Sequence, residues 1–148
     1  MNKPSWVERN RLLLQFDLEN KSVIDFGCGD KSILDYIKFK NYLGLDKVDT
    51  ADVIVDFNKD AIPVNGTFDV GLVLGVLEYV DDDEHFITSI TKYSDYFIIL
   101  VLTQVKMKTW HGWKRVYSED SFKSFLHKHF SNVKLHKHNK YIIAEARK

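Results

Sequence analysis

The sequence predicts an open α/β sheet of seven mostly parallel strands with helices on both faces. Three observations predict this fold class. Apolar segments of strand length alternate with segments of helical periodicity, the first strand runs into a glycine turn, and the chain closes with two alternating segments around His138-Asn139-Lys140 that predict an antiparallel hairpin. The length of 148 residues suits one domain, which we expect to span residues 1–148.

The strands are expected at seven places along the chain. They are residues 22–26, 42–45, 52–55, 68–74, 96–102, 133–138 and 141–146. Residues 68–74 and 96–102 are apolar almost throughout, as strands covered on both faces are. Only residues 47–51 separate the second strand from the third, which is too short for a crossover helix, so we expect a turn or an abbreviated helical turn there.

Helical spacing of apolar residues predicts helices before and between these strands. They are expected at residues 5–16, 32–39, 81–93 and 118–130. Ser5 is a suitable N-cap for the first helix. In the last helix, Ser118 with Ser121 lacks the acid of a full capping box, although Glu119 and Asp120 suit a first helical turn.

The most informative segment runs from Ser22 to Asp30 and reads SVIDFGCGD. Gly27 and Gly29 permit a tight turn and a close approach of a ligand to the backbone, because neither carries a Cβ. Asp46 follows the next predicted strand and lies about 20 positions downstream. This spacing is typical of a nucleotide-like cofactor that lies across the edge of a parallel sheet, with the Asp46 carboxylate on the ribose hydroxyls.

From about Lys21 to the C-terminus, the chain resembles the class I S-adenosylmethionine-dependent methyltransferases. Four segments carry the resemblance in the family's order. They are Val23-Ile24-Asp25-Phe26-Gly27-Cys28-Gly29, Gly44-Leu45-Asp46, Asp56-Phe57-Asn58 and residues 68–80, FDVGLVLGVLEYV. The resemblance implies a Rossmann-like sheet with strand order 3-2-1-4-5-7-6 and the last strand antiparallel. It also implies a core at residues 21–148 and, at residues 1–20, a helical segment that packs at the substrate side.

The chain departs from the family pattern in three places. Lys31 stands where many members have a third glycine, and Tyr79 stands where many have a histidine. The short link between strands two and three also lacks a helix that many members have, which makes this a minimal version of the fold. These departures leave the fold unchanged and bear mainly on the substrate and on cofactor affinity.

The resemblance implies that the cofactor is S-adenosylmethionine, and the charges near the glycine turn agree. Asp25 and Asp30 flank the turn, where they would repel the pyrophosphate of a dinucleotide but attract a sulfonium and an ammonium group. A nicotinamide-dependent oxidoreductase would also need a proton relay such as a tyrosine–lysine pair. Tyr36-Ile37-Lys38 has the wrong spacing and place for one.

The resemblance also implies roles for individual residues. Those expected to bind the cofactor are Asp25, Gly27, Cys28, Gly29, Asp46, Lys47, Asp56, Phe57, Asn58, Leu74 and Gly75. The segment from Asp25 to Gly29 would line the methionine end, with Cys28 as a small turn residue rather than a nucleophile. Asp56 would meet the adenine amino group, and Leu74 with Gly75 would pass under the reacting centre. For Phe57, ordinary core packing is the competing interpretation, and for Lys47 a solvated lysine.

Methyl transfer from a sulfonium is an in-line displacement on carbon, so positioning can supply much of the catalysis, and a general base helps a hydroxyl nucleophile. His111 and Tyr79 are the candidate catalytic residues; Glu78 and Tyr117 are also considered. His111 lies in the aromatic segment Trp110-His111-Gly112-Trp113, and a surface histidine is the competing interpretation. The two tryptophans either wall the substrate or pin the loop to the core, and both interpretations stay open.

Composition narrows the function classes. The chain has 21 basic and 21 acidic residues, so no net field attracts a nucleic acid or a membrane. No apolar run approaches the roughly 20 residues of a bilayer span, and the N-terminus lacks a signal-peptide core. The single cysteine excludes an internal disulfide, and the histidines at 127, 129, 136 and 138 lack the cysteine or paired carboxylate that would complete a metal site. We therefore expect a soluble, cytoplasmic protein without a metal.

These features predict an S-adenosylmethionine-dependent methyltransferase that acts by direct in-line transfer to a small molecule such as a sugar or metabolite hydroxyl. Lys106, Lys108, Lys114 and Arg115 leave open an anionic or nucleotide-linked substrate. A nucleic acid substrate is disfavoured, and a homodimer or a partner subunit is left open. The alternative is a non-catalytic module that binds S-adenosylmethionine, or the partner subunit of an active methyltransferase.

Overall fold

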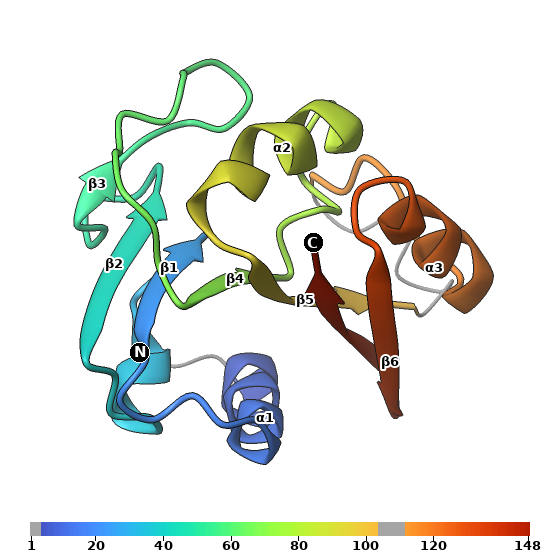
Figure 1. The fold of residues 1–148 in the computed structure, drawn as a ribbon, viewed down its shortest axis with the longest axis horizontal. Coiled ribbons are helices and arrows are strands. Elements are labelled where there is room, and N and C mark those ends of the chain that lie inside the picture. Colours follow the sequence, from blue (N-terminus) through green and yellow to red (C-terminus); the bar gives the residue numbers. More distant parts are fainter. Residues whose placement is uncertain (1–3, 104–111) are drawn as a thin grey trace.

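The computed structural model describes residues 4–103 and 112–148, which form a seven-stranded sheet with helices on both sides (Figure 1). The strands are β1 (Ser22–Phe26), β2 (Asn41–Asp46), β3 (Val53–Ile54), β4 (Val70–Leu74), β5 (Tyr96–Leu102), β6 (Asn132–His138) and β7 (Tyr141–Arg147). Their order is β3-β2-β1-β4-β5-β7-β6, with β7 antiparallel to both β5 and β6 and the other neighbours parallel. The predicted fold class, strand order and reversed last strand are confirmed.

The register of the sheet brings the carboxyl ends of the parallel strands to one edge. Asp25 on β1 is paired with Gly44 on β2 and with Leu72 on β4. The turn after β1 is tied to the end of β2, because the backbone amides of Gly27 and Cys28 both donate to the Leu45 carbonyl, at 2.7 and 3.0 Å. Segments that follow β1, β2, β3 and β4 therefore meet where ligands bind in open α/β sheets.

The helices are α1 (Pro4–Leu12), α2 (Asp83–Ile90) and α3 (Glu119–His127), with 3₁₀-helices η1 (Leu13–Gln15), η2 (Ser32–Asp35) and η3 (Thr91–Tyr93). Figure 1 shows α1 below the sheet and α2 above it. The core divides in the same way, because successive strand residues point to opposite faces. Ile24 and Phe26 pack in the core with α2 and α3, whereas Val23 packs in the core with η1 and η2.

The helix predicted at residues 32–39 is wrong, because only Ser32–Asp35 is helical and it forms a 3₁₀-turn. Lys31 enters this turn in the left-handed conformation at φ +61°, where the family pattern has glycine. The chain must then return to β2, and the Lys40 amide donates to the Lys21 carbonyl. The apolar spacing of Ile33 and Ile37 is satisfied by burial without a continuing helix.

Other boundaries differ from the prediction by a few residues. β3 is shorter than expected, β4 begins only at Val70, and the segment after α2 ends in the 3₁₀-helix η3. The expected turn between β2 and β3 is confirmed at Asp49 and Thr50. At the start of α3, the Ser121 hydroxyl takes the role of the missing acid, since it accepts from the Ser118 amide at 2.9 Å and completes a capping box. Within the described ranges, no helix is long and apolar enough to cross a bilayer.

Candidate functional site

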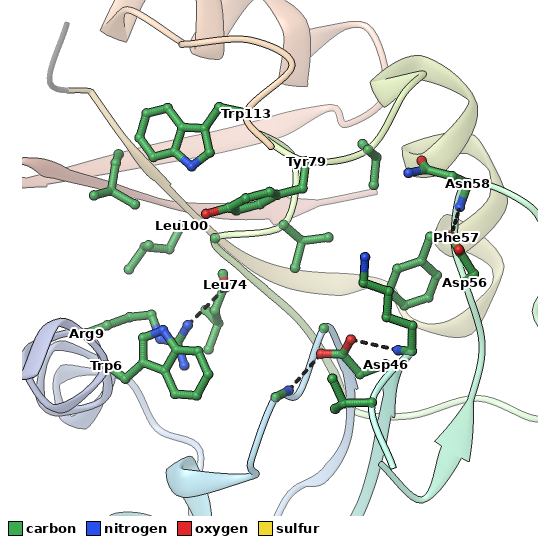
Figure 2. Close-up of a pocket in the computed structure, with 18 of the residues that line it drawn as sticks. Trp6, Arg9, Asp46, Asp56, Phe57, Asn58, Leu74, Tyr79, Leu100 and Trp113 are labelled. Carbon is green, nitrogen blue, oxygen red and sulfur yellow. Dashed lines mark hydrogen bonds between the residues drawn. The ribbon is translucent and has the colours of Figure 1, made fainter. Parts of the chain in front are cut away.

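A cavity of about 550 Å³ opens at the edge where the parallel strands end (Figure 2). This volume lies in the range of small-molecule and cofactor sites. Its lining divides into two ends. One end, called the ribose end because the sequence predicts a ribose there, is formed by the segments after β1, β2 and β3: Gly27, Gly29, Asp46, Lys47, Asp56, Phe57 and Asn58. The aromatic end is formed beyond β4 and beside β5 and β7: Tyr79, Leu100, Leu102, Trp113, Lys140 and Tyr141.

The glycine turn has a backbone that favours glycine at both positions. Gly27 has φ +91°, and a Cβ built there would lie 2.3 Å from Val76 Cγ2. Gly29 has φ +54°, and a Cβ there would lie 3.0 Å from the Trp6 ring. The turn thus places bare backbone against the cavity, as the sequence predicted.

Cys28 lies between the two glycines but is buried, and it does not line the cavity. Its side chain packs where a Cβ at Gly44 would be, at 2.9 Å. Burial, reinforced by the nearby Asp25 carboxylate, raises the pKa of the Cys28 thiol to about 12. The thiol therefore stays protonated at neutral pH and is no nucleophile.

Asp46 is held at the cavity by the backbone on both sides. Its Oδ2 accepts from the Gly29 amide at 2.9 Å, and its Oδ1 accepts from the Lys47 amide at 2.7 Å. Figure 2 shows both hydrogen bonds and the carboxylate facing the open space. Since each carboxylate oxygen has further acceptor capacity, Asp46 can take two hydroxyl donors from a ligand without losing its own support.

The segment after β3 supplies a polar wall and an aromatic one. Asp56 Oδ1 accepts from the Asn58 amide at 2.9 Å. The Phe57 ring lines the cavity and also packs edge-on against Phe86, with ring centroids 5.1 Å apart. Both interpretations of Phe57, cavity wall and core residue, therefore hold at once. Lys47 lines the same end of the cavity.

Leu74 and Gly75 form the floor between the two ends. The Gly75 amide donates to the Leu100 carbonyl at 2.9 Å, which joins the ends of β4 and β5. Gly75 has φ +72°, and a Cβ there would meet no atom within 4 Å. This glycine therefore leaves open space above the sheet rather than relieving a clash.

Asp25 does not line the cavity but lies buried beneath the glycine turn. Its Oδ2 accepts from the Tyr42 hydroxyl at 2.6 Å, and its Oδ1 has no hydrogen-bond partner among the described residues. Burial raises the pKa of this carboxyl to about 6. Asp25 is thus held by Tyr42 on β2 and is not among the residues that line the cavity.

Two residues of α1 line the cavity and were not foreseen from the sequence. Arg9 Nη1 donates to the Leu74 carbonyl at 3.2 Å, and the guanidinium lies 5.3 Å from the centre of the Trp6 ring. Arg9 Nε is buried without a partner among the described residues. The placement of residues 1–20 near a substrate was expected, but a cationic side chain at the floor of the cavity was not. No sequence motif marks it, because α1 and β4 lie far apart in the chain.

Of the two candidate catalytic residues, only Tyr79 lies in the described part of the chain. It lines the cavity and is 42% exposed. Its ring is perpendicular to that of Trp113, with centroids 6.3 Å apart. His111 and Trp110 lie outside the described residues. Among the described residues, no group of three or more histidine, cysteine, aspartate or glutamate side chains is arranged to hold a metal ion.

Glu78 is fully buried behind the aromatic end, at 0% exposure, and does not line the cavity. Its Oε2 accepts from the Leu102 amide at 3.0 Å, while Oε1 has no partner among the described residues. Burial raises the pKa of the Glu78 carboxyl to about 7. As a candidate base it therefore has a suitable pKa but no direct access to a ligand.

The raised pKa of Glu78 predicts a pH-dependent stability. The folded protein holds this proton more tightly than the unfolded chain, so the free energy of unfolding should fall as pH rises from about 4.5 to about 7. The expected loss is about 3 kcal/mol. Glu78→Gln should reduce the slope by this amount in urea unfolding, and the part due to Asp25, whose pKa is also raised by burial to about 6, should remain. Glu84→Gln is the control, because the pKa of Glu84 is lowered by its hydrogen bond from Lys128 and its contribution has the opposite sign. An unchanged slope in Glu78→Gln would contradict the assignment.

Fold and site together define an open α/β sheet with a reversed last strand and a ligand cavity at its carboxyl edge. This is the fold of the class I S-adenosylmethionine-dependent methyltransferases, and the similarity to solved structures of that class extends over nearly the whole chain. No sequence model of a known family matches the chain, and no curated protein matches it either.

Three solved structures illustrate the similarity. A methyltransferase from Aquifex aeolicus is 16% identical with a TM-score of 0.70, over 97% of this chain and 93% of that one. The N-methyltransferase NodS from Bradyrhizobium japonicum, solved with S-adenosylhomocysteine, is 14% identical with a TM-score of 0.71, over 99% and 88%. A chain of the Haloferax volcanii complex that contains the Trm112 methyltransferase activator is 13% identical with a TM-score of 0.72, over 96% and 89%.

Proposed function

We propose that this protein is an S-adenosylmethionine-dependent methyltransferase that binds its cofactor at the ribose end of the cavity and a small-molecule acceptor at the aromatic end. One observation carries the proposal. A single cavity joins a glycine turn and a backbone-anchored carboxylate to an open floor at the ends of β4 and β5. In this fold, a donor and an acceptor must meet over such a floor for an in-line transfer.

The residues present fit the cofactor group by group. Asp46 offers two anchored carboxylate oxygens to the ribose hydroxyls. The Phe57 ring can contact the adenine, and the side chains of Asp56 and Asn58 offer polar groups to it. At the other end, the Arg9 guanidinium is available for a carboxylate, and the buried Asp25 lends negative charge beneath the turn. Bound there, S-adenosylmethionine would supply a methyl group activated by its sulfonium.

The chain itself would act mainly by positioning and by excluding water. Leu74, Leu100 and Leu102 give the reacting region an apolar floor. Water excluded from such a region does not compete for the methyl group, and a fixed approach replaces a bimolecular encounter. Tyr79 lies where its hydroxyl can hydrogen-bond the acceptor, and a role for His111 stays a prediction.

The proposal is tested by calorimetric titration of the purified protein with S-adenosylmethionine and S-adenosylhomocysteine. Binding of both at one site, with a dissociation constant of about 1 to 100 μM, is the expected result. A titration with NADH serves as the control for the dinucleotide alternative, and no heat of binding is expected. Absence of binding by either adenosyl compound would overturn the cofactor assignment.

Gly75→Ala should separate binding from folding. The added Cβ meets no protein atom within 4 Å, so only the cost of a positive φ is expected, about 1 kcal/mol of the free energy of unfolding. The same methyl group would project from the floor of the cavity, and we expect at least a tenfold loss of S-adenosylhomocysteine affinity. Calorimetry measures the affinity and urea unfolding measures the free energy of unfolding, both on the same preparation. Unchanged affinity would show that the floor at Gly75 is not used.

A second candidate is a cofactor-binding subunit that acts only with a partner protein. The structural similarity to a chain of a complex containing a methyltransferase activator favours it. A methyl-transfer assay on the isolated chain with a panel of small acceptors separates the two. Cofactor binding without transfer to any acceptor, followed by transfer once a cell extract is added, would favour the partner-dependent form.

A further inference from the structure

The aromatic end of the cavity has a chemical character that points to a substrate class. Its walls are two rings set at right angles, since Tyr79 and Trp113 meet at 90° with centroids 6.3 Å apart. Leu100 and Leu102 add apolar surface from β5. At this distance and angle the two rings pack edge to face, and the surface that they form with the leucines favours a flat, largely apolar molecule.

Two polar groups at this end, the Trp113 indole N–H and the Lys140 ammonium, can only donate hydrogen bonds. The Trp113 indole Nε1–H is buried and has no hydrogen-bond partner among the described residues. A buried donor without a partner lowers the stability of the free protein, so a ligand atom that accepts this hydrogen bond gains binding free energy. In Figure 2 the indole nitrogen points toward the space beside Tyr79 and Leu100. An acceptor atom on the ligand is therefore expected there.

Lys140 adds a positive charge at the same end. The Thr103 amide donates to the Lys140 carbonyl at 2.9 Å, which fixes the start of β7 beside the end of β5. The ammonium lies 5.4 Å from the centre of the Tyr141 ring, and no carboxylate pairs with it in the described ranges. The charge of Lys140 is thus left for a ligand.

The acids are distributed in the opposite way. Among the described residues that line the cavity, the acids are Asp46 and Asp56, and both lie at the ribose end. The buried Glu78 does not reach the lining. A cationic amine placed at the aromatic end would therefore meet Lys140 and no facing carboxylate, whereas an oxyanion would meet a cation and a buried N–H donor.

We propose that the aromatic end binds a planar aromatic molecule that carries an oxyanion, such as an aromatic carboxylate, as the methyl acceptor. This inference rests on the proposed function and adds the substrate class to it. The ring lies against Tyr79 and Trp113, and the oxygen atoms face the indole N–H and Lys140. The methyl group would pass from the sulfonium to an oxygen of the oxyanion. The new O–C bond forms from an oxygen lone pair as the C–S bond breaks, the thioether of the cofactor leaves with the electron pair of the C–S bond, and no proton is released because the attacking oxygen carries none.

The test uses small probes in place of the unidentified acceptor. Para-hydroxybenzoate is titrated into protein saturated with S-adenosylhomocysteine, beside its methyl ester, tyramine and cyclohexanecarboxylate. The methyl ester is a neutral ring, tyramine is a cationic ring and cyclohexanecarboxylate is a non-planar anion, whereas para-hydroxybenzoate is a planar anion. We expect para-hydroxybenzoate to bind at least tenfold more tightly than each of the others. Equal or tighter binding of tyramine would overturn the proposal.

Two variants tie the result to the residues. Lys140→Met keeps the apolar stem, and should weaken para-hydroxybenzoate about tenfold while leaving the ester unchanged. Trp113→Phe keeps a ring but removes the N–H, and should weaken both ring probes several-fold. Lys134→Met, on the exposed strand β6, is the matched control and should change nothing. Variants that leave the affinities unchanged would also overturn the proposal.

Failure of the substrate proposal can be distinguished from failure of the cofactor assignment. S-adenosylhomocysteine binding is measured first and alone, so its failure would strike the proposed function. The probe series is then repeated without it, because the aromatic end is formed by the chain itself. Binding of S-adenosylhomocysteine with no preference among the probes would leave the methyltransferase proposal intact and reject the substrate class.

Discussion

Asp46→Ala is expected to weaken S-adenosylhomocysteine binding by about 100-fold or more. Hydrogen bonds to a charged group each contribute about 1.5 to 3 kcal/mol, and two ribose hydroxyls would share this carboxylate. The side chain is fixed before binding by the Gly29 and Lys47 amides, so little ordering is left for the ligand to impose. Calorimetric titration of the variant beside the wild type measures the effect.

Two further variants separate the lost ligand contact from a disturbed turn. Asp46→Asn retains an acceptor for the Gly29 amide but loses the charge, so an intermediate affinity is expected. Asp49→Ala changes an exposed acid in the same connection and should bind as the wild type does. Urea unfolding shows whether Asp46→Ala is folded. A folded Asp46→Ala variant that binds within threefold of the wild type would contradict the assignment of Asp46 to the ribose.

Gly27→Ala is expected to lower the free energy of unfolding by about 3 kcal/mol or more. Two costs combine at this position. The backbone has φ +91°, which an L residue adopts only with strain of about 1 to 3 kcal/mol. The new Cβ would also lie 2.3 Å from Val76 Cγ2, and overpacking of this kind costs about 1 to 3 kcal/mol. Urea or thermal unfolding of the variant provides the measurement.

The chain offers a matched control for the two costs. Gly66 has a similar φ of +98°, but nothing lies within 4 Å of its Cβ position. Gly66→Ala should therefore show the cost of the backbone alone, about 1 kcal/mol. Adding Val76→Ala to Gly27→Ala should recover the part due to the clash. Equal destabilisation by Gly27→Ala and Gly66→Ala would mean that Val76 moves aside freely.

The sequence was sufficient for the fold because its signals are local and repeated. Residues 96–102 are apolar throughout and form the buried strand β5, and the shortened link at residues 47–51 is the turn expected from its length. The four motif segments come together because each follows a parallel strand, and parallel strands end at one edge. Asp46, Phe57 and Gly75, which the family resemblance placed at the cofactor, all line the cavity at this edge.

The wrong helix prediction has a physical reason. The apolar spacing at residues 32–39 is compatible with a helix, but the return of the chain to β2 decided the conformation. Asp25, expected to bind the cofactor, is buried on the same face of the sheet as Val23 and is not among the residues that line the cavity, so its role stays a prediction.

Other residues of the site could not be read from the sequence at all. Arg9 and Lys140 come from segments far apart in the chain, and no local pattern distinguishes them from solvated residues. Trp113 is a candidate substrate wall from the sequence, but its aromatic segment leaves core packing equally open. Their roles arise from tertiary contacts, such as the hydrogen bond from Arg9 to the Leu74 carbonyl. The proposed substrate class therefore rests on contacts seen in the structure, whereas the cofactor was expected from the motifs.

The attachment of α1 has a thermodynamic consequence. The helix is joined to the glycine-turn side by a 2.9 Å hydrogen bond from the Asn10 side-chain Nδ2 to the Ser32 hydroxyl, and it carries Trp6 and Arg9 to the cavity. Any ligand that touches these two side chains binds the docked helix in preference to the undocked one. Ligand binding and docking of α1 are therefore thermodynamically linked. A ligand that binds more tightly should slow the hydrogen exchange of the backbone amides of α1 to a greater extent.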